Sequence, residues 1–296
     1  MNHQWPAGFV EDRLAKERKK ELILRRGGDP IRRIAQAGLK LSGLSARGRR
    51  NALDLQLELN NLRLPNWPDE LHGFRILHLS DPHIPESGDD ELIDGMMRLA
   101  QSTPHDLAVL TGDYRDRSFG PQQQAMVSMS KLRPALANQA IAILGNHDSI
   151  ESVGPLQAAG YDVLVNETCT ITYNGKPFDV LGVDDPSYYQ QHDLNHCVQN
   201  ASTDHRLLLS HSPDIYRDVE ALSISVLLCG HTHGGQICTP SGYPIRHASK
   251  VDVELLSGSW TFGALQGYTS RGAGTSIIDA RFFCPPELTI HTLLTR

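Results

Sequence analysis

Five short apolar segments of this chain each end directly before a residue type that binds metal ions. They are FRILHLS before Asp81, LAVLTG before Asp113, IAILG before Asn146, LLLS before His211 and SVLLCG before His231. Runs of Val, Ile and Leu that stop at Gly or Ser predict buried strands. Because ligands of α/β sheets bind at the carboxyl ends of the strands, the pattern predicts a single site.

The candidate ligands of this site combine imidazoles with oxygen donors. They are Asp81, His83, Asp113, Asn146, His211, His231 and His233. Such a mixed set suits Mn, Fe, Zn, Co or Ni better than Ca or Mg, which prefer shells of oxygen alone. A structural zinc ion takes four ligands that usually include Cys. Seven candidates therefore predict two ions that share a bridging ligand.

Two pairs of candidates are spaced by one residue, Asp81 with His83 and His231 with His233. Residues i and i+2 of an extended segment point to the same side. We therefore expect each pair to present two side chains to one cluster.

The motifs DPH, GD, GNHD, SHSPD and GHTHGGQ occur in that order, and together they resemble the five motifs of the calcineurin-like metallophosphoesterases. The resemblance covers residues 70–296. GHTHGGQI, YTSRGAGTS and CPPEL resemble the bacterial phosphodiesterase branch of that superfamily. The resemblance implies a four-layer αββα sandwich, and it implies hydrolysis of a P–O bond by a hydroxide that two divalent metal ions activate, with Mn, Fe or Zn expected.

The resemblance also implies a role for each ligand. Asp81, His83 and His233 would hold one ion, Asn146, His211 and His231 would hold the other, and Asp113 would bridge the two. His147 would stabilise the phosphoryl group or protonate the leaving oxygen, with Asp148 orienting its imidazole. Asp148 could equally be a turn residue, because Asp favours turns through its own hydrogen bonds.

Other residues near these motifs have simpler explanations. Arg115 and Asp116 could solvate a loop or face the substrate. The SRGAGTS segment lacks the spacing of a phosphate-binding P-loop. Arg271 could contact a phosphate, but a tight turn or a close backbone approach between strands explains Gly272 and Gly274 at least as well, so we leave Arg271 out of the site. The nine remaining histidines belong to none of the motifs and are expected to be structural.

Length and composition favour one large domain with an extension. The chain has 296 residues, of which 40% are hydrophobic, so it can bury a substantial core. We place a catalytic domain at residues 51–296 and a basic, partly helical extension at residues 1–50. The five cysteines are odd in number and contain no CxxC pair, which indicates neither a disulfide framework nor a thiolate zinc site. A reducing, cytoplasmic location is expected.

Charge separates the two parts. Residues 1–50 contain 13 Lys and Arg against 5 Asp and Glu, a net charge of +8, whereas the remainder contains 15 against 29, a net charge of −14. No apolar stretch is long enough for a transmembrane helix, and the charged N-terminus does not resemble a signal peptide. The extension could contact an anionic membrane from the inner face or pack on its own domain.

A helix in the extension is predicted after Asp29-Pro30. Ile31, Ile34, Ala35, Gly38 and Leu41 recur at helical spacing, and basic residues lie elsewhere around the helix, which is typical of helices that lie on anionic lipid. Many members of the bacterial branch span the membrane at this end, and this chain departs from that pattern.

Beyond the extension, Leu53, Leu55, Leu57 and Leu59 alternate with polar residues, which predicts a half-buried strand. Helices are expected near 90–101, 121–138 and 151–160, and further short strands within 162–183 and 224–294.

The resemblance leaves three other functions to weigh. A UDP-2,3-diacylglucosamine-type pyrophosphatase acts on a nucleotide-sugar lipid, but its usual form carries Arg where this chain has His147. A metal-binding scaffold tends to lose ligands, whereas all seven positions here are competent. A nucleic-acid enzyme could use the basic arm for phosphate contacts, but the acidic body argues against a long bound duplex.

Overall fold

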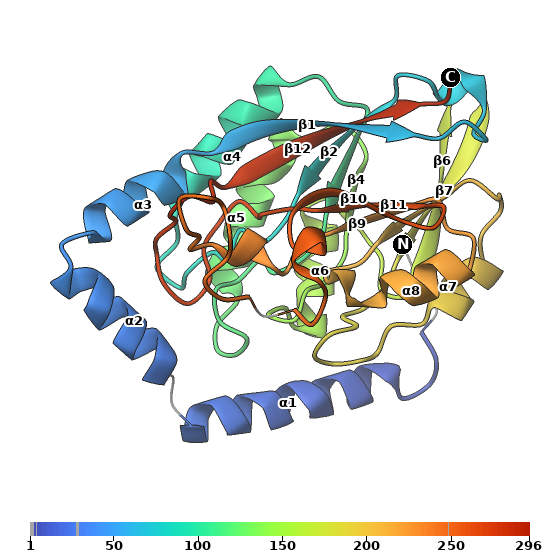
Figure 1. Ribbon diagram of the computed structural model, residues 1–296. Helices are drawn as coiled ribbons and strands as arrows, with labels where there is room; N and C mark the ends of the chain where they lie inside the picture. Colours follow the sequence, from blue (N-terminus) through green and yellow to red (C-terminus); the bar gives the residue numbers. More distant parts are fainter. Residues whose placement is uncertain (1–2, 4, 28–29, 248) are drawn as a thin grey trace.

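The computed structural model describes residues 3, 5–27, 30–247 and 249–296. Two six-stranded mixed sheets pack against each other in the centre, and helices cover their outer faces (Figure 1). The first sheet has the strand order β1-β12-β2-β3-β4-β5 and the second the order β10-β11-β9-β8-β7-β6. The predicted αββα sandwich is therefore confirmed.

The strands of the first sheet are β1 Gln56–Arg63, β12 Glu287–Leu294, β2 Arg75–Leu79, β3 Leu107–Leu110, β4 Ala140–Ala142 and β5 Asp162–Val163. Those of the second are β10 Gly258–Phe262, β11 Leu265–Thr269, β9 Val226–Cys229, β8 Arg206–Leu209, β7 Lys176–Gly182 and β6 Glu167–Tyr173. In the first sheet β2, β3 and β4 are parallel neighbours, as are β7, β8 and β9 in the second. Their carboxyl ends therefore meet at one edge of the sandwich.

The hydrophobic core lies in three layers, because alternate residues of a strand point to opposite faces. In β3, Leu107 and Val109 face the second sheet, whereas Ala108 and Leu110 face the helices on the outside. In β8, Leu207 and Leu209 face the first sheet. Strands that are buried on both faces read as unbroken apolar runs, which is why the sequence shows no alternation there.

The expected helices in the body are present. They are α4 Asp90–Ser102, α5 Gln123–Leu132 and α6 Val153–Ala158 on the first sheet. Two short helices that were not expected, α7 Leu194–Gln199 and α8 Tyr216–Ala221, cover the second sheet. Short 3₁₀ turns occur at Asp69–Leu71, Arg133–Ala135, Ile150–Ser152, Pro213–Ile215, His233–Gly235 and Val253–Leu255.

The extension forms helices α1 Phe9–Gly27, α2 Pro30–Leu41 and α3 Ser45–Leu53, which run round one edge of the body (blue in Figure 1). The predicted helix after Asp29-Pro30 is thus present as α2, although Asp29 and the side chain of Ile31 lie outside the described residues. The boundary expected at residue 50 falls inside α3. Among the described residues, no helix combines the length and the apolar character needed to cross a bilayer.

Strand β1 differs from the sequence expectation in the side to which its leucines point. The alternation of leucines predicted an apolar face turned toward the core, but Leu57 is 37% exposed and Leu59 is 74% exposed. The inward positions are taken by Glu58 and Asn60, which bond to Arg271 and His291, and by buried Leu62. Because β1 is an edge strand, its polar residues can pair with side chains of neighbouring strands while its leucines remain at the surface.

Candidate metal centre

The five segments predicted to end at one site do so. Asp81 and Asp113 follow the parallel neighbours β2 and β3, and Asn146 follows β4 in the same sheet. His211 and His231 follow β8 and β9 of the second sheet. The site therefore lies where the carboxyl ends of strands from both sheets converge.

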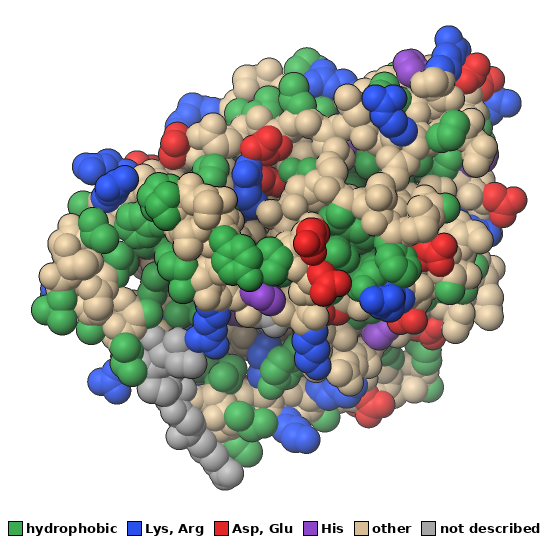
Figure 2. Space-filling view, viewed as in Figure 1, with side chains coloured by type: hydrophobic (Ala, Val, Ile, Leu, Met, Phe, Trp, Pro, Cys, Tyr) green, Lys and Arg blue, Asp and Glu red, His purple; other side chains and the backbone are tan. Residues whose placement is uncertain are grey.

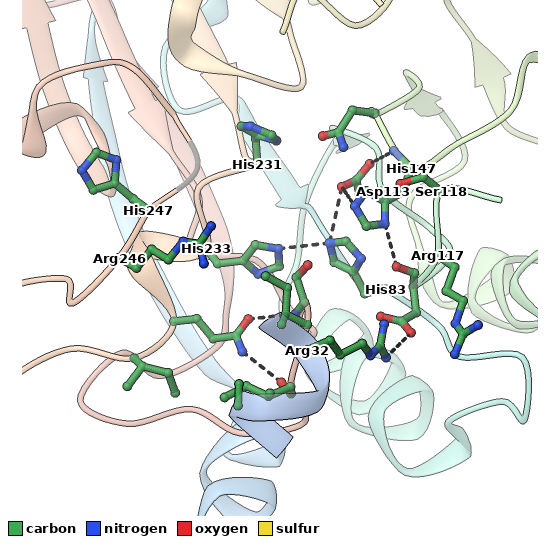
Figure 3. Close-up of a pocket in the computed structure, with 18 of the residues that line it drawn as sticks. Arg32, His83, Asp113, Arg117, Ser118, His147, His231, His233, Arg246 and His247 are labelled. Atoms are coloured by element: carbon green, nitrogen blue, oxygen red, sulfur yellow. Dashed lines mark hydrogen bonds and ion pairs between the residues drawn. The ribbon is translucent and has the colours of Figure 1, made fainter. Parts of the chain in front are cut away.

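One group of potential ligands consists of Asp81, His83 and His233. His233 Nε2 lies 3.5 Å from Asp81 Oδ1 and 3.0 Å from His83 Nε2, and His83 Nε2 lies 3.7 Å from Asp81 Oδ1. All three residues are buried. Figure 3 shows the rings of His83 and His233 pointing toward each other.

A second group consists of Asp113, His211 and His231. His231 Nδ1 lies 3.2 Å from His211 Nε2, which in turn lies 3.0 Å from Asn146 Oδ1. The amide oxygen of Asn146 therefore lies beside this group.

Asp113 lies between the two groups. Its Oδ2 atom is 3.4 Å from His83 Nε2 in the first group and 3.3 Å from His211 Nε2 in the second. A carboxylate oxygen at nearly equal distance from both groups is in the position that a bridging ligand requires.

The spacing of these donor atoms fits metal binding. Ligand atoms about 2.1 Å from one ion, as for Zn, lie roughly 3.0 to 3.4 Å apart in octahedral or tetrahedral arrangements. The nitrogen and oxygen atoms described above are 3.0–3.7 Å apart. Two imidazole nitrogens without a proton between them repel at such distances, so a cation is the partner that this donor set fits.

The backbone at the ligands is unusual. Asp81, His83, Asp113, His231 and His233 all have positive φ, between 45° and 70°. The left-handed conformation costs a non-glycine residue roughly 1 to 2 kcal/mol, and such residues cluster at functional sites. The pairs Asp81/His83 and His231/His233 are therefore not extended as predicted. Each pair still reaches one cluster, because tight turns aim both side chains.

Two glycines allow this close packing of loops. A Cβ atom on Gly230 would collide with Ser80 and Asp81, and one on Gly274 would collide with the carbonyl of Pro82. The expected close approach at Gly274 is confirmed. Arg271 forms ion pairs with Glu58 and Glu287, which agrees with its omission from the site.

His147 is held by the backbone of a neighbouring loop. Its Nδ1 atom lies 2.6 Å from the Asp116 carbonyl oxygen, so Nδ1 carries the proton and Nε2 is left 4.0 Å from Asp113 Oδ2. The side chain is 20% exposed and is open to the cavity. Burial lowers the pKa of His147 to about 3, so the ring is neutral in the free protein.

Asp148 does not orient the His147 ring in the way we expected. Its carboxylate accepts hydrogen bonds from the backbone N–H groups of Asp113, Tyr114 and Gly145, at 2.7, 2.9 and 2.9 Å. The orientation of the imidazole comes from the Asp116 carbonyl instead. Burial and the nearby Asp113 charge raise the pKa of Asp148 to about 6. Asp148 thus fixes the loops that carry Asp113 and Asn146.

The carboxylates and imidazoles of the site stabilise one another's charges. Burial alone would raise the pKa of Asp81, but His233 and His83 together hold it below its usual value. Burial alone would lower the pKa of His211, yet the Asp113 carboxylate raises it to about 10. A metal ion that binds here must therefore displace a proton from His211.

Sequence reasoning missed several supporting residues. Thr111 Oγ1 donates to Ser80 Oγ at 2.6 Å, and Ser80 Oγ donates to Asp81 Oδ2 at 2.5 Å. The Thr111 carbonyl lies 2.7 Å from His211 Nδ1, which leaves Nε2 facing the cluster. Arg281 is fully buried and donates to the carbonyl of Gly274. Serine, threonine and arginine are too common for any motif to have indicated these roles.

Arg115 is buried and holds neighbouring loops, whereas Asp116 lines the cavity beside the ligand groups. The Arg115 guanidinium donates to the carbonyls of His147, Ser118 and Gly120 at 2.6–3.2 Å. The Asp116 carboxylate forms an ion pair with Arg32 of α2, with a nitrogen–oxygen distance of 2.7 Å. The loop after β3 is therefore tied both to His147 and to the extension.

A cavity of about 990 Å³ opens over the ligand groups. Cationic and imidazole side chains line part of it, namely Arg25, Arg32, Arg33, Arg117, Arg246 and His247. Apolar side chains line another part, namely Leu24, Ala35, Phe119, Ile237, Ile245, Ile277 and Ile278. Figure 3 shows α2 beside the ligands, with Arg32 on it, and Figure 2 shows basic and histidine side chains around a hollow on this face. His247, which the sequence placed among the structural histidines, lines the cavity.

Similarities to known proteins bear on this geometry. Residues 74–235 match the family model described as calcineurin-like phosphoesterase, a range that contains every predicted ligand together with His147 and Asp148. The chain is 28% identical to the uncharacterized metallophosphoesterase YkoQ of Bacillus subtilis, over 82% of this chain and 92% of the relative. It is 30% identical to the phosphodiesterase YaeI of Escherichia coli, over 80% and 88%. It is 25% identical to the UDP-2,3-diacylglucosamine pyrophosphatase LpxG of Chlamydia muridarum, over 81% and 89%.

Proposed function

The chain belongs to the calcineurin-like phosphoesterase family, and from that premise we propose that it is a phosphodiesterase that depends on two divalent metal ions. The observation that carries the proposal is the position of Asp113, whose Oδ2 atom lies 3.4 Å and 3.3 Å from the imidazoles of the two ligand groups. One group would consist of Asp81, His83 and His233, and the other of Asn146, His211 and His231.

Two divalent ions held by these residues would supply a hydroxide at neutral pH and positive charge beside the phosphoryl oxygens. Mn, Fe and Zn suit the donor set. The side chains of the site bind and orient the ions. Buried Asp81 stays negatively charged, and the Thr111 carbonyl holds His211 so that its Nε2 atom faces the cluster.

His147 is the residue that we expect to act on the substrate without binding an ion. Its Nε2 faces the cavity while Nδ1 is fixed by the Asp116 carbonyl. An anionic phosphoryl group beside the ring raises the pKa of His147 by charge attraction. The protonated ring can then stabilise the phosphoryl oxygens and donate its proton to the leaving oxygen. Asp148 contributes by fixing the loop on which His147 lies.

A nucleotide-sugar lipid is the second candidate substrate. The apolar part of the cavity wall favours it, because Ile237, Ile245 and Ile277 offer contacts that a small diester does not need. The similarity to a pyrophosphatase of that class agrees. Against it stands His147, at a position where the usual form of that group carries Arg.

A single assay separates the two candidates. Hydrolysis of bis(p-nitrophenyl) phosphate, p-nitrophenyl phosphate and UDP-2,3-diacylglucosamine is compared with Mn, Fe, Zn and Ni, with His147→Ala as the control. We expect the diester to be cleaved faster than the monoester. Activity on the nucleotide lipid alone would replace the first candidate by the second.

We also propose that the extension contacts an anionic membrane through α2. Ile34 is 72% exposed and Leu41 is 89% exposed, and exposed Arg33 and Lys40 lie on the same helix. Figure 2 shows hydrophobic side chains along the left margin of the molecule, where α2 and α3 lie. An apolar strip with basic neighbours suits the surface of anionic lipid.

Sedimentation with vesicles tests this contact. The full chain should sediment with vesicles that contain phosphatidylglycerol, and Ile34→Asp combined with Leu41→Asp should abolish binding while Leu59→Asp on β1 leaves it intact. Equal binding by both variants would refute a role for α2. Salt-sensitive binding to DNA would instead favour the nucleic-acid alternative.

A further inference from the structure

The inner face of α1 carries charged side chains that are buried beside the metal centre. Arg13 is fully buried and Lys20 is 4% exposed. Positions 13, 17 and 20 lie on one face of the helix. Removing two cations from water is unfavourable unless each finds close partners, and apolar packing alone would not place them here. Their partners therefore indicate what this face of α1 does.

Alternate residues of the loop after β4 bond to this face. Lys20 Nζ donates to the Asn146 carbonyl at 2.5 Å, and Arg13 Nη2 donates to the Asp148 carbonyl at 3.3 Å. Glu17 Oε1 accepts a hydrogen bond from the N–H of Ile150 at 2.9 Å. The segment held in this way contains both a ligand, Asn146, and the proposed catalytic residue, His147.

The same side chains are anchored on a second loop, which fixes α1 along its length. Arg13 Nε lies 2.8 Å from Asp184 Oδ2, and its guanidinium lies 3.3 Å above the ring of Tyr189. Lys20 Nζ lies 4.0 Å from the centre of the Tyr188 ring. The loop that carries Asn146 and His147 is thus connected through α1 to the loop after β7.

We propose that Arg13, Glu17 and Lys20 are positioning residues of the metal centre. They act through the backbone at positions 146, 148 and 150, and they keep the Asn146 oxygen beside His211 and the His147 ring toward the cavity. The basic extension therefore helps to hold the metal ligands and His147 in place. The inference rests on the proposed function for its kinetic test, but not for its metal-binding test.

Two neighbouring lysines of α1 give a matched experiment. Lys20 is buried, whereas Lys19 is exposed. For Lys20→Met and Lys19→Met in the full chain we would measure kcat and KM on bis(p-nitrophenyl) phosphate, Mn²⁺ binding by titration calorimetry, and the melting temperature. Groups that orient metal ligands typically contribute about 10- to 100-fold. We expect Lys20→Met to lower kcat and weaken one Mn²⁺ site by that factor at nearly constant KM, and Lys19→Met to match the wild type.

A double-mutant cycle tests the route of the effect. If Lys20 acts through the loop of His147, Lys20→Met should lower kcat much less in a His147→Ala background than in the wild type. Full multiplication of the two losses, together with Mn²⁺ binding that Lys20→Met leaves unchanged, would overturn the proposal. So would a Lys20→Met protein whose kcat and Mn²⁺ binding match those of Lys19→Met and whose melting temperature alone is lower.

Glu17 keeps the proposal testable if Lys20→Met does not fold. Glu17→Ala removes the acceptor for Ile150, whereas Glu17→Gln retains an oxygen there. We expect Glu17→Ala to weaken Mn²⁺ binding and Glu17→Gln to restore most of it; equal Mn²⁺ binding by the two variants would count against positioning. A wild type that cleaves no ester would refute the proposed function, and the Mn²⁺ titrations would still decide this inference.

Discussion

The loops at the strand ends and helix α1 both lie at the metal centre, but they contribute in different ways. The loops supply side chains that can bind cations, such as Asp113 and His211. Among the described residues, helix α1 contributes no side chain to the ligand groups, and its buried charged side chains bond to the backbone of a loop instead. The comparison teaches that ligands leave a recognisable pattern in a sequence, whereas the residues that hold ligands in place do not.

The largest effect is expected at the centre of the ligand loops. Asp113→Asn keeps the shape of the side chain and removes the charge shared by both groups. Each ion contributes several kcal/mol to stabilising the transition state, so we expect turnover to fall more than about 10⁴-fold and both Mn²⁺ ions to bind weakly. Metal analysis checks this, with Asp116→Asn from the same loop as the control. Two tightly bound ions in Asp113→Asn would contradict the bridging role of Asp113.

Substitution of His147 should lower kcat without reducing metal binding, although His147 lies next to the predicted ligand Asn146. His147→Ala removes a group that we propose contacts the substrate, and it removes no predicted ligand. General acid catalysis by histidine typically contributes roughly 10²- to 10⁴-fold, and we expect a loss of kcat in that range with two ions still bound. A His147→Ala protein that loses one ion would make His147 a ligand, which its grouping with His83 and Asp113 would permit.

Affinity for metal ions should rise with pH, because a ligand must lose a proton when an ion binds. Because Asp113 raises the pKa of His211 to about 10, the free protein carries a proton there that a cation must displace. Below that pH, affinity for Mn²⁺ should rise about tenfold per pH unit for each proton released. Calorimetric titration in buffers of different ionisation enthalpy counts these protons. Affinity that is constant between pH 6 and pH 8 would contradict the assignment of His211.

The smallest effect is expected on α2, where the extension touches the site through a partly exposed ion pair. Arg32→Gln breaks the contact with Asp116. Such pairs contribute about 0 to 1 kcal/mol, so KM should change less than about fivefold. Lys40→Gln, on the exposed part of the same helix, is the matched control. A loss of kcat as large as that of His147→Ala would mean that α2 controls the catalytic loop as well.

The positions of the ligands could be predicted because the chemistry limits the choice of residues. Few residue types bind a cation, and each of those found follows a buried strand, as Asp81 follows β2. The path of the backbone could not be predicted in this way. Asp81 and His83 were expected in an extended segment and instead adopt positive φ, since contacts between loops of different strands decide the local conformation.

The roles of buried charges could not be predicted for a related reason. The sequence left open whether the basic extension packs on its own domain, because the loop partners of Arg13 and Lys20, Asp184 and Asn146, lie more than 120 positions away in the chain. Asp148 was assigned to the ring of the adjacent His147, but its carboxylate faces backbone N–H groups of three loop residues. Hydrogen bonds between distant segments depend on the fold, and one sequence contains no direct record of them.

The central claim is that seven side chains of the two sheets bind a pair of cations through a shared Asp113. Crystals grown with MnCl₂ and measured above and below the manganese absorption edge test it directly. We expect two anomalous peaks in the site, each about 2.0 to 2.4 Å from its ligands, with Asp113 contacting both. A single peak, or peaks away from these side chains, would contradict it.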